Sequence, residues 1–378
     1  MLDKALDGIR IVDFTQIASG PTCTLILADL GADVIKIESP AGDVARRLGP
    51  PWIDDVGVFF LALNRNKKGV AVDLKDPVQR ERVRRLIQNS DVLVENFRPG
   101  VMQRLGLDYE TLSRGHSRLV YCSISGYGQT GDWGSRGGVD GVIQALSGIM
   151  ATTGEEGGAP VKVQVPIVDI VTGFLAANAV QAALHDRRRT GLGQYLDVSM
   201  LASALMLQQT AFAGYLSSGD LPRRCGSAAP YAAPNEAFPT ADGWIMIVAY
   251  HQERWAVLCD LLGRPHLVQD SRFVTLADRV KNRSSMFEAL ADVLRTRKTA
   301  EWLHILEAAD VLCAPIAGYA ETVALPPTLQ SGLLVDVPHP TVGSMRQIGC
   351  ALSLPAQPVK RGAPAIGEHT AEVLGHID

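Results

Sequence analysis

The chain has 378 residues, 47% of them apolar and 20% charged, which is ordinary for a globular protein with room for more than one domain. A formal net charge of −4 provides no basic domain for nucleic acid, so no nucleic-acid partner is expected. The six cysteines show no C-x-x-C pair or Cys/His cluster, which argues against a metal site or a disulfide framework.

Localisation follows from two further absences in the sequence. The amino terminus has no signal-peptide pattern, and the longest apolar stretches are interrupted by Gly, Gln or Asp before they reach the length of a membrane span. We therefore expect a cytoplasmic protein that does not contact a membrane.

The first half of the chain alternates strand and helix patterns. Apolar runs predict strands at 9–14, 33–38, 70–74, 91–96 and 119–125, and helical patterns lie between them at 22–30 and 76–89. This alternation predicts a parallel, doubly wound α/β sheet. Ligands of such sheets bind at the carboxyl ends of the strands, which directs attention to residues 15–21, 39–47, 75, 96–98 and 126–140.

The second half begins with two longer helical patterns and then changes in composition. Residues 220–240 are rich in Ala, Pro and Gly and are interpreted as a linker. A smaller second domain is expected after it, with a strand at 244–248 and helices at 251–262, 284–295 and 299–309. The two longer helices are expected at 170–187 and 198–217, and a last helix at 368–376.

A glycine-rich segment follows the strand at 119–125. Residues 126–131 match G-x-G-x-x-G, the pattern of dinucleotide-binding turns. The helical pattern resumes only near Val139, whereas a phosphate cradle needs the helix directly after the glycines. A glycine-rich loop is therefore favoured, and a non-catalytic nucleotide-binding Rossmann protein is kept as an alternative hypothesis.

Asp169 is a lone carboxylate inside the apolar run 165–174. Because burying an unpaired charge is costly, this residue needs a structural reason. Periodicity favours Asp169 as the N-cap of the helix at 170–187. A carboxylate at a helix N-terminus stays ionised and can also be a nucleophile, so the two interpretations are compatible.

With these features the chain resembles the class III CoA-transferases, the CaiB/BaiF family, and the related α-methylacyl-CoA racemases. The likeness covers nearly the whole length. Nine segments carry it in the same order: 6–14, 19–21, 31–38, 64–68, 91–100, 125–128, Asp169 with Gly173, 191–194 and 238–243.

The resemblance implies a fold and an assembly. It implies an α/β architecture in which a large Rossmann-like domain with a parallel sheet is built from both ends of the chain, 1–220 and 326–378. A smaller α/β domain would comprise 221–325. It also implies an interlocked homodimer, in which each subunit threads through the other.

The resemblance further implies a mechanism. Asp169 would attack an acyl-CoA thioester to form a mixed anhydride, and CoA would return through an aspartyl-CoA thioester. Backbone N–H groups of 126–138 and of Gly226 are candidates for stabilising the oxyanions. The substrates would be an acyl-CoA and a carboxylic acid, with no metal.

The CoA contacts implied by the resemblance lie at strand ends. Lys75 and Arg104 would donate to the phosphates. Gly137 stands where some members have a basic residue, with Arg136 beside it, and Asp140 matches an acidic position near the nucleophile. The other positions that carry over are Gln16, Ile17, Ala18, Val72, Asn96 and Phe97.

Departures from the family pattern decide between activities. Val139 stands where the racemases have an acid/base histidine, and it cannot move a proton, so transfer is favoured over a racemase-like isomerase. Residues 228–231 lack the multi-glycine loop of oxalate-type transferases, which argues against an oxalate/formate pair. Succinyl-CoA or another small dicarboxylyl-CoA is the candidate donor, with Arg46, Arg47 or Arg65 to hold its second carboxylate.

Overall fold

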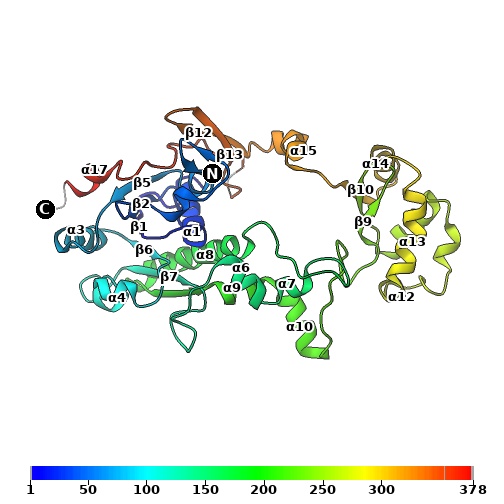
Figure 1. Ribbon diagram of the computed structural model, residues 1–378, viewed down its shortest axis with the longest axis horizontal. Coiled ribbons are helices and arrows are strands. Elements are labelled where there is room, and N and C mark those ends of the chain that lie inside the picture. The colour runs from blue at the N-terminus through cyan, green and yellow to red at the C-terminus, as the bar shows by residue number, and fades with distance from the viewer. Residues whose placement is uncertain (1, 353, 376–378) are drawn as a thin grey trace. The chain divides into compact units, whose positions relative to one another are not determined.

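The computed structural model describes residues 2–352 and 354–375. The chain divides into two compact units (Figure 1). The first is drawn from the described residues of Met1–Ile149, Lys162–Ser218 and Pro326–Asp378. The second contains Gly219–Leu325 and also Met150–Val161, which lies far before it in the sequence.

A six-stranded parallel sheet forms the centre of the first unit, so the predicted α/β fold with a parallel sheet is confirmed. The strand order is β5-β2-β1-β6-β7-β8. The chain adds β2 and β5 on one side of β1 and then β6, β7 and β8 on the other side, so the switch point lies between β1 and β6. Ligands of open α/β sheets bind at such a switch point, beyond the carboxyl ends of the strands. The strands are β1 (Arg10–Asp13), β2 (Asp33–Glu38), β5 (Lys67–Ala71), β6 (Val92–Glu95), β7 (Val120–Ser125) and β8 (Tyr195–Ser199).

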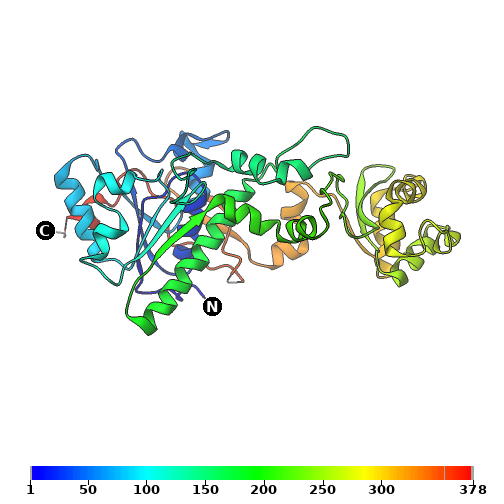
Figure 2. The same ribbon diagram turned by 90° about the horizontal axis from the view of Figure 1, so that it is seen from below.

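Helices cover both faces of this sheet because the strands are apolar on both sides. Ile11 packs into a core with α1 (Ser19–Asp29) and α8 (Ile167–Thr190), whereas its neighbour Val12 packs on the other face with α3 (Pro77–Gln88). Figure 2 shows α8 as the long green helix alongside the sheet. By length and composition α8 could cross a membrane, and half of its most apolar window is buried inside the protein.

Shorter elements complete the first unit. They are η1 (Val44–Arg47), β3 (Trp52–Ile53), β4 (Val56–Gly57), α2 (Val58–Leu63), α4 (Val101–Leu105), α5 (Tyr109–Ser113), α6 (Asp140–Leu146), α7 (Ile149–Thr152), α9 (Met200–Leu207), α10 (Gln209–Ser218), α16 (Pro326–Gln330), β12 (Leu334–His339), β13 (Gly343–Ile348) and α17 (Thr370–Leu374). The first residue of α7 falls in this unit and the rest in the second.

The second unit has its own core around a three-stranded antiparallel sheet, β11-β10-β9. Ile245, Ile247 and Trp255 are fully buried in it. Its strands are β9 (Asn235–Pro239), β10 (Trp244–Val248) and β11 (Leu312–Pro315), and its helices are α11 (Gln252–Leu261), η2 (Pro265–Val268), α12 (Leu276–Lys281), α13 (Arg283–Leu294), α14 (Thr299–Ala308) and α15 (Tyr319–Ala324).

Several sequence-based boundaries were wrong. The third predicted strand begins at Lys67 rather than Val70, because the Lys67 side chain is buried and bonded inside the fold instead of marking a solvated end. Two short strands were missed: β8 lies mostly in the gap between the helices predicted at 170–187 and 198–217, and β9 lies in the predicted linker. Each has only five residues and is recognised by its pairing with β7 or β10.

Candidate active site

The turn after β1 lies at the switch point of the sheet and has an unusual backbone. Ile17 has a φ of 66°, a left-handed conformation that a β-branched residue rarely adopts. Its N–H donates to Asp43 Oδ1 at 3.2 Å. The N–H of Gln16 donates to Asn96 Oδ1, and Asn96 Nδ2 donates back to the Gln16 carbonyl, both at 2.8 Å. Side chains from two other loops therefore hold this strained turn in place.

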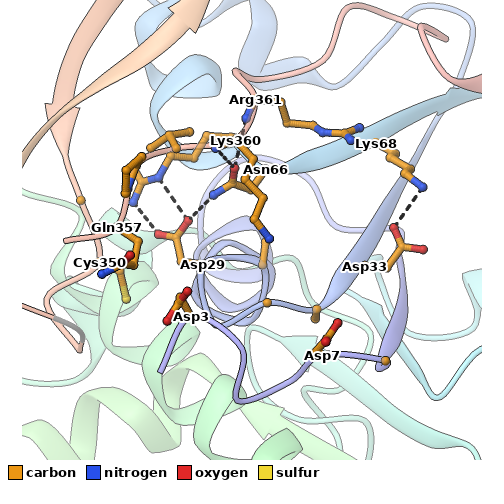
Figure 3. A pocket seen from close by; sticks show the side chains of 18 residues that line it. Asp3, Asp7, Asp29, Asp33, Asn66, Lys68, Cys350, Gln357, Lys360 and Arg361 are labelled. Atoms are coloured by element: carbon orange, nitrogen blue, oxygen red, sulfur yellow. Dashed lines mark hydrogen bonds and ion pairs between the residues drawn. The ribbon is translucent and has the colours of Figure 1, made fainter. Parts of the chain in front are cut away.

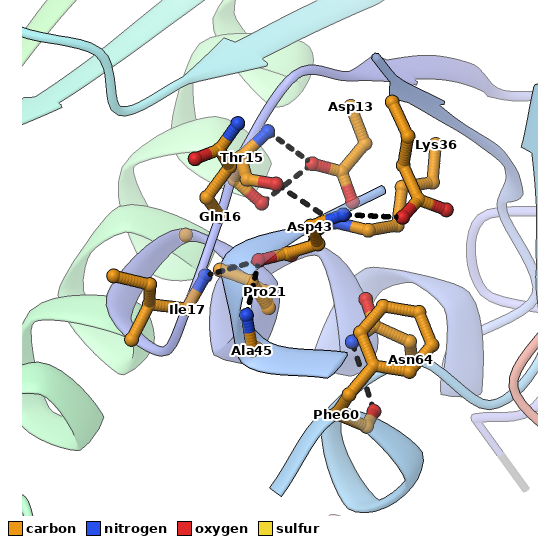
Figure 4. Close-up of polar contacts among 12 residues, drawn as sticks. Asp13, Thr15, Gln16, Ile17, Pro21, Lys36, Asp43, Ala45, Phe60 and Asn64 are labelled. Carbon is orange, nitrogen blue, oxygen red and sulfur yellow. Dashed lines mark hydrogen bonds and ion pairs between the residues drawn. The ribbon is translucent and has the colours of Figure 1, made fainter. Parts of the chain in front are cut away.

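A buried ionic network supports the turn from below (Figure 4). Lys36 Nζ contacts Asp43 at 2.9 Å and donates to the Thr15 carbonyl at 2.7 Å. Asp13 accepts from the Thr15 N–H at 2.8 Å and pairs with Lys67 Nζ at 3.1 Å. Burial lowers the pKa of Lys67 to about 8 despite the nearby Asp13 charge. Burial alone would raise the pKa of Asp13, but Lys67 and Lys36 lower it overall.

Asp169 is not the N-cap of its helix, so the predicted cap was wrong. Helix α8 begins at Ile167, after Pro166, and Asp169 is its third residue. The first-turn N–H groups of Val168 and Asp169 donate instead to Asp140 Oδ1, at 2.9 and 3.3 Å. A carboxylate 29 residues earlier in the chain thus caps α8 and stands directly behind Asp169.

Asp140 is itself fixed by a side-chain network. Gln144 Nε2 donates to Asp140 Oδ2 at 2.6 Å. The Gln144 side-chain carbonyl accepts from the Val163 N–H at 2.9 Å, which fastens the segment leading into α8 to helix α6. Asp140 is 8% exposed and is absent from the lining of the cavity at Asp169, so it affects the site through Asp169 rather than through contact with a substrate.

The environment of Asp169 favours the protonated form of its carboxyl group. Burial, together with the charge of Asp140, raises the pKa of Asp169 to about 7, while hydrogen bonds from the Ser19 hydroxyl and backbone N–H lower it. A carboxyl tuned in this way is less stabilised by solvent than an ordinary surface aspartate, which suits a nucleophile.

Asp169 lines a cavity of about 430 Å³ at the carboxyl ends of β1, β6 and β7. The other ionic side chains in its lining are the guanidinium groups of Arg98 and Arg136, and Arg136 also stacks on Trp133 at 4.0 Å. This composition suits an anionic ligand. The lining comprises Gln16, Ile17, Ala18, Ser19, Asn96, Phe97, Arg98, Pro99, Ile124, Ser125, Gly126, Arg136, Gly137, Gly138, Val139, Asp169 and Met200.

This cavity brings together many of the residues singled out from the sequence. Beside Asp169 they are Gln16, Ile17, Ala18, Asn96, Phe97 and Gly137. Four others lie outside the lining: Val72 and Asp140 are buried, whereas Lys75 and Arg104 are exposed. Sequence reasoning passed over Ser19 and Arg98 as individual site residues, although both stand in segments that it had marked.

The arginines proposed for a substrate carboxylate lie elsewhere. Arg46 pairs with Glu38 at 2.7 Å and Arg65 with Asp29 at 2.6 Å, and Arg47 donates to a backbone carbonyl. None of the three lines the cavity at Asp169.

A larger cavity, of about 450 Å³, lies at the amino ends of the strands. Figure 3 shows Lys68 beside Asp33 and Asn66 bonded to Asp29, and Asp29 also pairs with Arg65. It contains neither Asp169 nor the strained turn, so the smaller cavity is the better candidate for the chemistry.

Known proteins resemble this chain over nearly its whole length. The sequence matches CoA-transferase family III over residues 6–370. It is 37% identical to the Homo sapiens succinyl-CoA:glutarate CoA-transferase, covering 99% of this chain and 86% of that protein. It is 35% identical to the Agrobacterium fabrum succinate–glutarate CoA-transferase, covering 99% of this chain and 96% of that protein.

A solved structure shares the fold over the full length. The crystal structure of a CaiB/BaiF family protein from Brucella suis superimposes with a TM-score of 0.88 at 35% identity and covers 100% of both chains. The family inferred from the sequence motifs is confirmed. The chain belongs to CoA-transferase family III, the CaiB/BaiF family, and is a transferase enzyme.

Proposed function

We propose that this enzyme moves CoA from a small dicarboxylyl-CoA, with succinyl-CoA as the candidate donor, to a carboxylic acid through covalent intermediates on Asp169. One observation carries the proposal: Asp169, with a pKa raised to about 7, lines a cavity at the switch point of the sheet whose other ionic groups are arginines. Relatives named for succinyl-CoA and glutarate support the choice of donor.

The reaction proceeds by four exchanges at carbonyl carbons. An Asp169 oxygen attacks the thioester carbon, the C–S bond breaks, and CoA leaves as a thiolate from a mixed anhydride. The thiolate attacks the Asp169 carboxyl carbon and releases the donor acid as its carboxylate. The acceptor carboxylate then attacks the aspartyl-CoA thioester and frees the thiolate. Attack of that thiolate on the acceptor carbonyl gives the new acyl-CoA and restores Asp169, with no net proton change.

The cavity offers groups for both parts of the substrate. We assign Gln16, Ile17, Ala18, Asn96, Phe97 and Gly137 to the pantetheine arm, because they line the cavity with Asp169. Arg98 and Arg136 can bind a phosphate or the second carboxylate of the donor acid. Lys75 and Arg104, both exposed beyond strand ends, are assigned to the nucleotide phosphates. Val72 is also assigned to the nucleotide region, where its side chain would pack rather than donate a hydrogen bond.

The lining also favours transfer over racemisation. Val139 lines the cavity and is 58% exposed, and no histidine is present in the described lining. A racemase needs a proton-transfer group on each face of the α-carbon. Nothing in the reaction above requires a metal, and the proposed chemistry uses none.

We further propose that the enzyme is an interlocked homodimer in the cytoplasm. Helix α10 has no buried residue, and its Leu216 is 77% exposed. Exposed apolar side chains of this kind mark surfaces covered by a partner. Cys23, Cys122, Cys225, Cys259 and Cys313 are free thiols, which fits a reducing compartment.

The proposal is tested by removing Asp169. Asp169→Ala is expected to lose succinyl-CoA-dependent CoA transfer to ¹³C-labelled glutarate by at least about 10³-fold, since no other group replaces the covalent intermediate. In the wild type, acyl-CoA followed by hydroxylamine should label Asp169, as read by peptide mass spectrometry.

A surface aspartate of the second unit provides the control for this test. Asp260 is exposed on α11, so Asp260→Ala should retain both transfer and labelling of Asp169. Transfer that persists without Asp169, or labelling at another residue, would refute the covalent role.

A further inference from the structure

Ser19 faces the nucleophile from a second helix. It is the first residue of α1, is 4% exposed, and lines the same cavity as Asp169. Its hydroxyl and its backbone N–H both lower the pKa of the Asp169 carboxyl, as hydrogen-bond donors near a carboxylate do. Because Pro21 has no N–H and Thr22 already bonds to Ala18, the first turn of α1 has donors left over only at Ser19 and Gly20.

Gly173 makes this contact possible. It lies one turn after Asp169 on α8, and a Cβ there would stand 2.7 Å from the Ser19 carbonyl oxygen and 2.6 Å from Thr22 Cβ. Such distances exclude any side chain, because both neighbours belong to the first turn of α1. The spacing of Asp169 and Gly173 therefore sets how closely the two helices approach, and so places Ser19 against the carboxylate.

The chemistry gives this contact a specific use. When the CoA thiolate attacks the anhydride at the Asp169 carboxyl carbon, a C–S bond forms and the carbonyl electron pair moves onto the Asp169 oxygen. When that oxyanion collapses, the C=O bond re-forms and the donor carboxylate leaves. Attack by the acceptor carboxylate on the aspartyl-CoA thioester produces the same oxyanion. In these two steps the negative charge therefore develops on an oxygen of Asp169, not on the substrate carbonyl.

We propose that Ser19 is a catalytic residue whose hydroxyl and N–H form an oxyanion site for attack on the Asp169 carbonyl. The role rests on the proposed covalent mechanism. Neutral anhydride and thioester carbonyls accept weaker hydrogen bonds than an oxyanion, so the two donors stabilise mainly the transition states. Buried and held by helix packing, Ser19 needs no reorganisation when the charge appears.

The test compares two buried hydroxyls in one helix turn. Ser19→Ala removes the hydroxyl that faces Asp169, and Thr22→Val removes one for which the described residues offer no hydrogen-bond partner. With succinyl-CoA and glutarate, Ser19→Ala should lower kcat about 10- to 100-fold, because the backbone N–H remains, with little change in KM. Thr22→Val should leave kcat and KM unchanged.

Two further readouts separate catalysis from a structural role. Rapid quench and intact-protein mass spectrometry with succinyl-CoA alone should show slower formation of the enzyme–CoA adduct in Ser19→Ala. The acidic limb of kcat/KM should move to higher pH, because the hydroxyl lowers the pKa of Asp169. Ser19→Cys, close in size but a weak donor, should repeat both effects in a variant that preserves the packing.

Some outcomes would overturn the role of Ser19. One is that Ser19→Ala and Ser19→Cys keep the wild-type kcat, rate of adduct formation and pH profile. The other is that these variants change only in KM or in thermal stability. If the wild type labels Asp169 while these variants behave normally, only the Ser19 assignment fails. If the wild type forms no adduct at Asp169, the covalent mechanism itself fails.

Discussion

The carboxyl group of Asp169 lies near the like charge of Asp140 and near two hydrogen-bond donors of Ser19. Burial and Asp140 raise its pKa to about 7, and Ser19 opposes them. The folded protein therefore holds this proton more tightly than the unfolded chain, and ionising Asp169 costs stability as the pH rises from about 4 to 7. Attack on the thioester needs the ionised form, so kcat/KM should rise with pH through the same region.

The contribution of Asp140 can be isolated at this scale. Asp140→Asn keeps a carbonyl oxygen for capping α8 but removes the like charge, so the acidic limb of kcat/KM should move to lower pH. Its amide faces the Gln144 Nε2 donor, and losing that bond should cost about 1–2 kcal/mol of unfolding free energy. The pH–rate profile and urea unfolding measure the two effects.

An exposed aspartate in the same glycine-rich segment is the control. Asp132→Asn should change neither quantity, because Asp132 lies outside the lining of the cavity. An acidic limb that stays in place in Asp140→Asn would show that Asp140 does not set the pKa of Asp169.

At the scale of elements, the strained turn after β1 rests on the network of Asp13, Lys36, Asp43 and Lys67. Lys67 and Asp13 are fully buried, so each depends on the other to offset its desolvation. The network fixes the carbonyl of Thr15 and the N–H of Ile17, and thereby the backbone that lines the cavity. The same buried contacts therefore hold the strands together and position the backbone of the site.

Removing one partner tests this support. Lys67→Met leaves Asp13 buried without its ammonium partner and should lower the unfolding free energy by about 3–5 kcal/mol, with a raised KM for acyl-CoA. The adjacent Lys68 pairs on the surface with Asp33 and Glu372, so Lys68→Met should cost less than about 1 kcal/mol. Denaturant unfolding at pH 7 compares them, and equal losses would contradict the network's role.

At the scale of the whole molecule, the exposed apolar side chains of α10 predict assembly. Light scattering after gel filtration should give a mass near twice the 40.6 kDa of one chain. Leu216→Asp places a charge where we expect a partner and should shift the mass toward the monomer. Val78→Asp, at a residue 63% exposed on α3, is the control and should stay dimeric. A wild-type monomer at micromolar concentration would refute the dimer.

Local patterns in the sequence determined the parallel α/β sheet and the family, and they singled out Asp169 as the candidate nucleophile. Strands such as 33–38 and the helix opened by Asp76 and Pro77 could be located because periodicity and capping act between near neighbours. The motifs at strand ends also indicated which segments would converge, since parallel strands bring their carboxyl ends to one edge.

Only the tertiary structure decided what surrounds Asp169. Its helix is capped by Asp140, Ser19 lines the same cavity and lowers the pKa of its carboxyl, and the turn beside it depends on the pairing of Lys67 with Asp13. Each of these contacts joins residues between 28 and 150 positions apart, and no local periodicity encodes such a pair. Asp169 could therefore be singled out from the sequence as the candidate nucleophile, whereas its pKa and the donors near it follow from how α1, α6 and α8 pack.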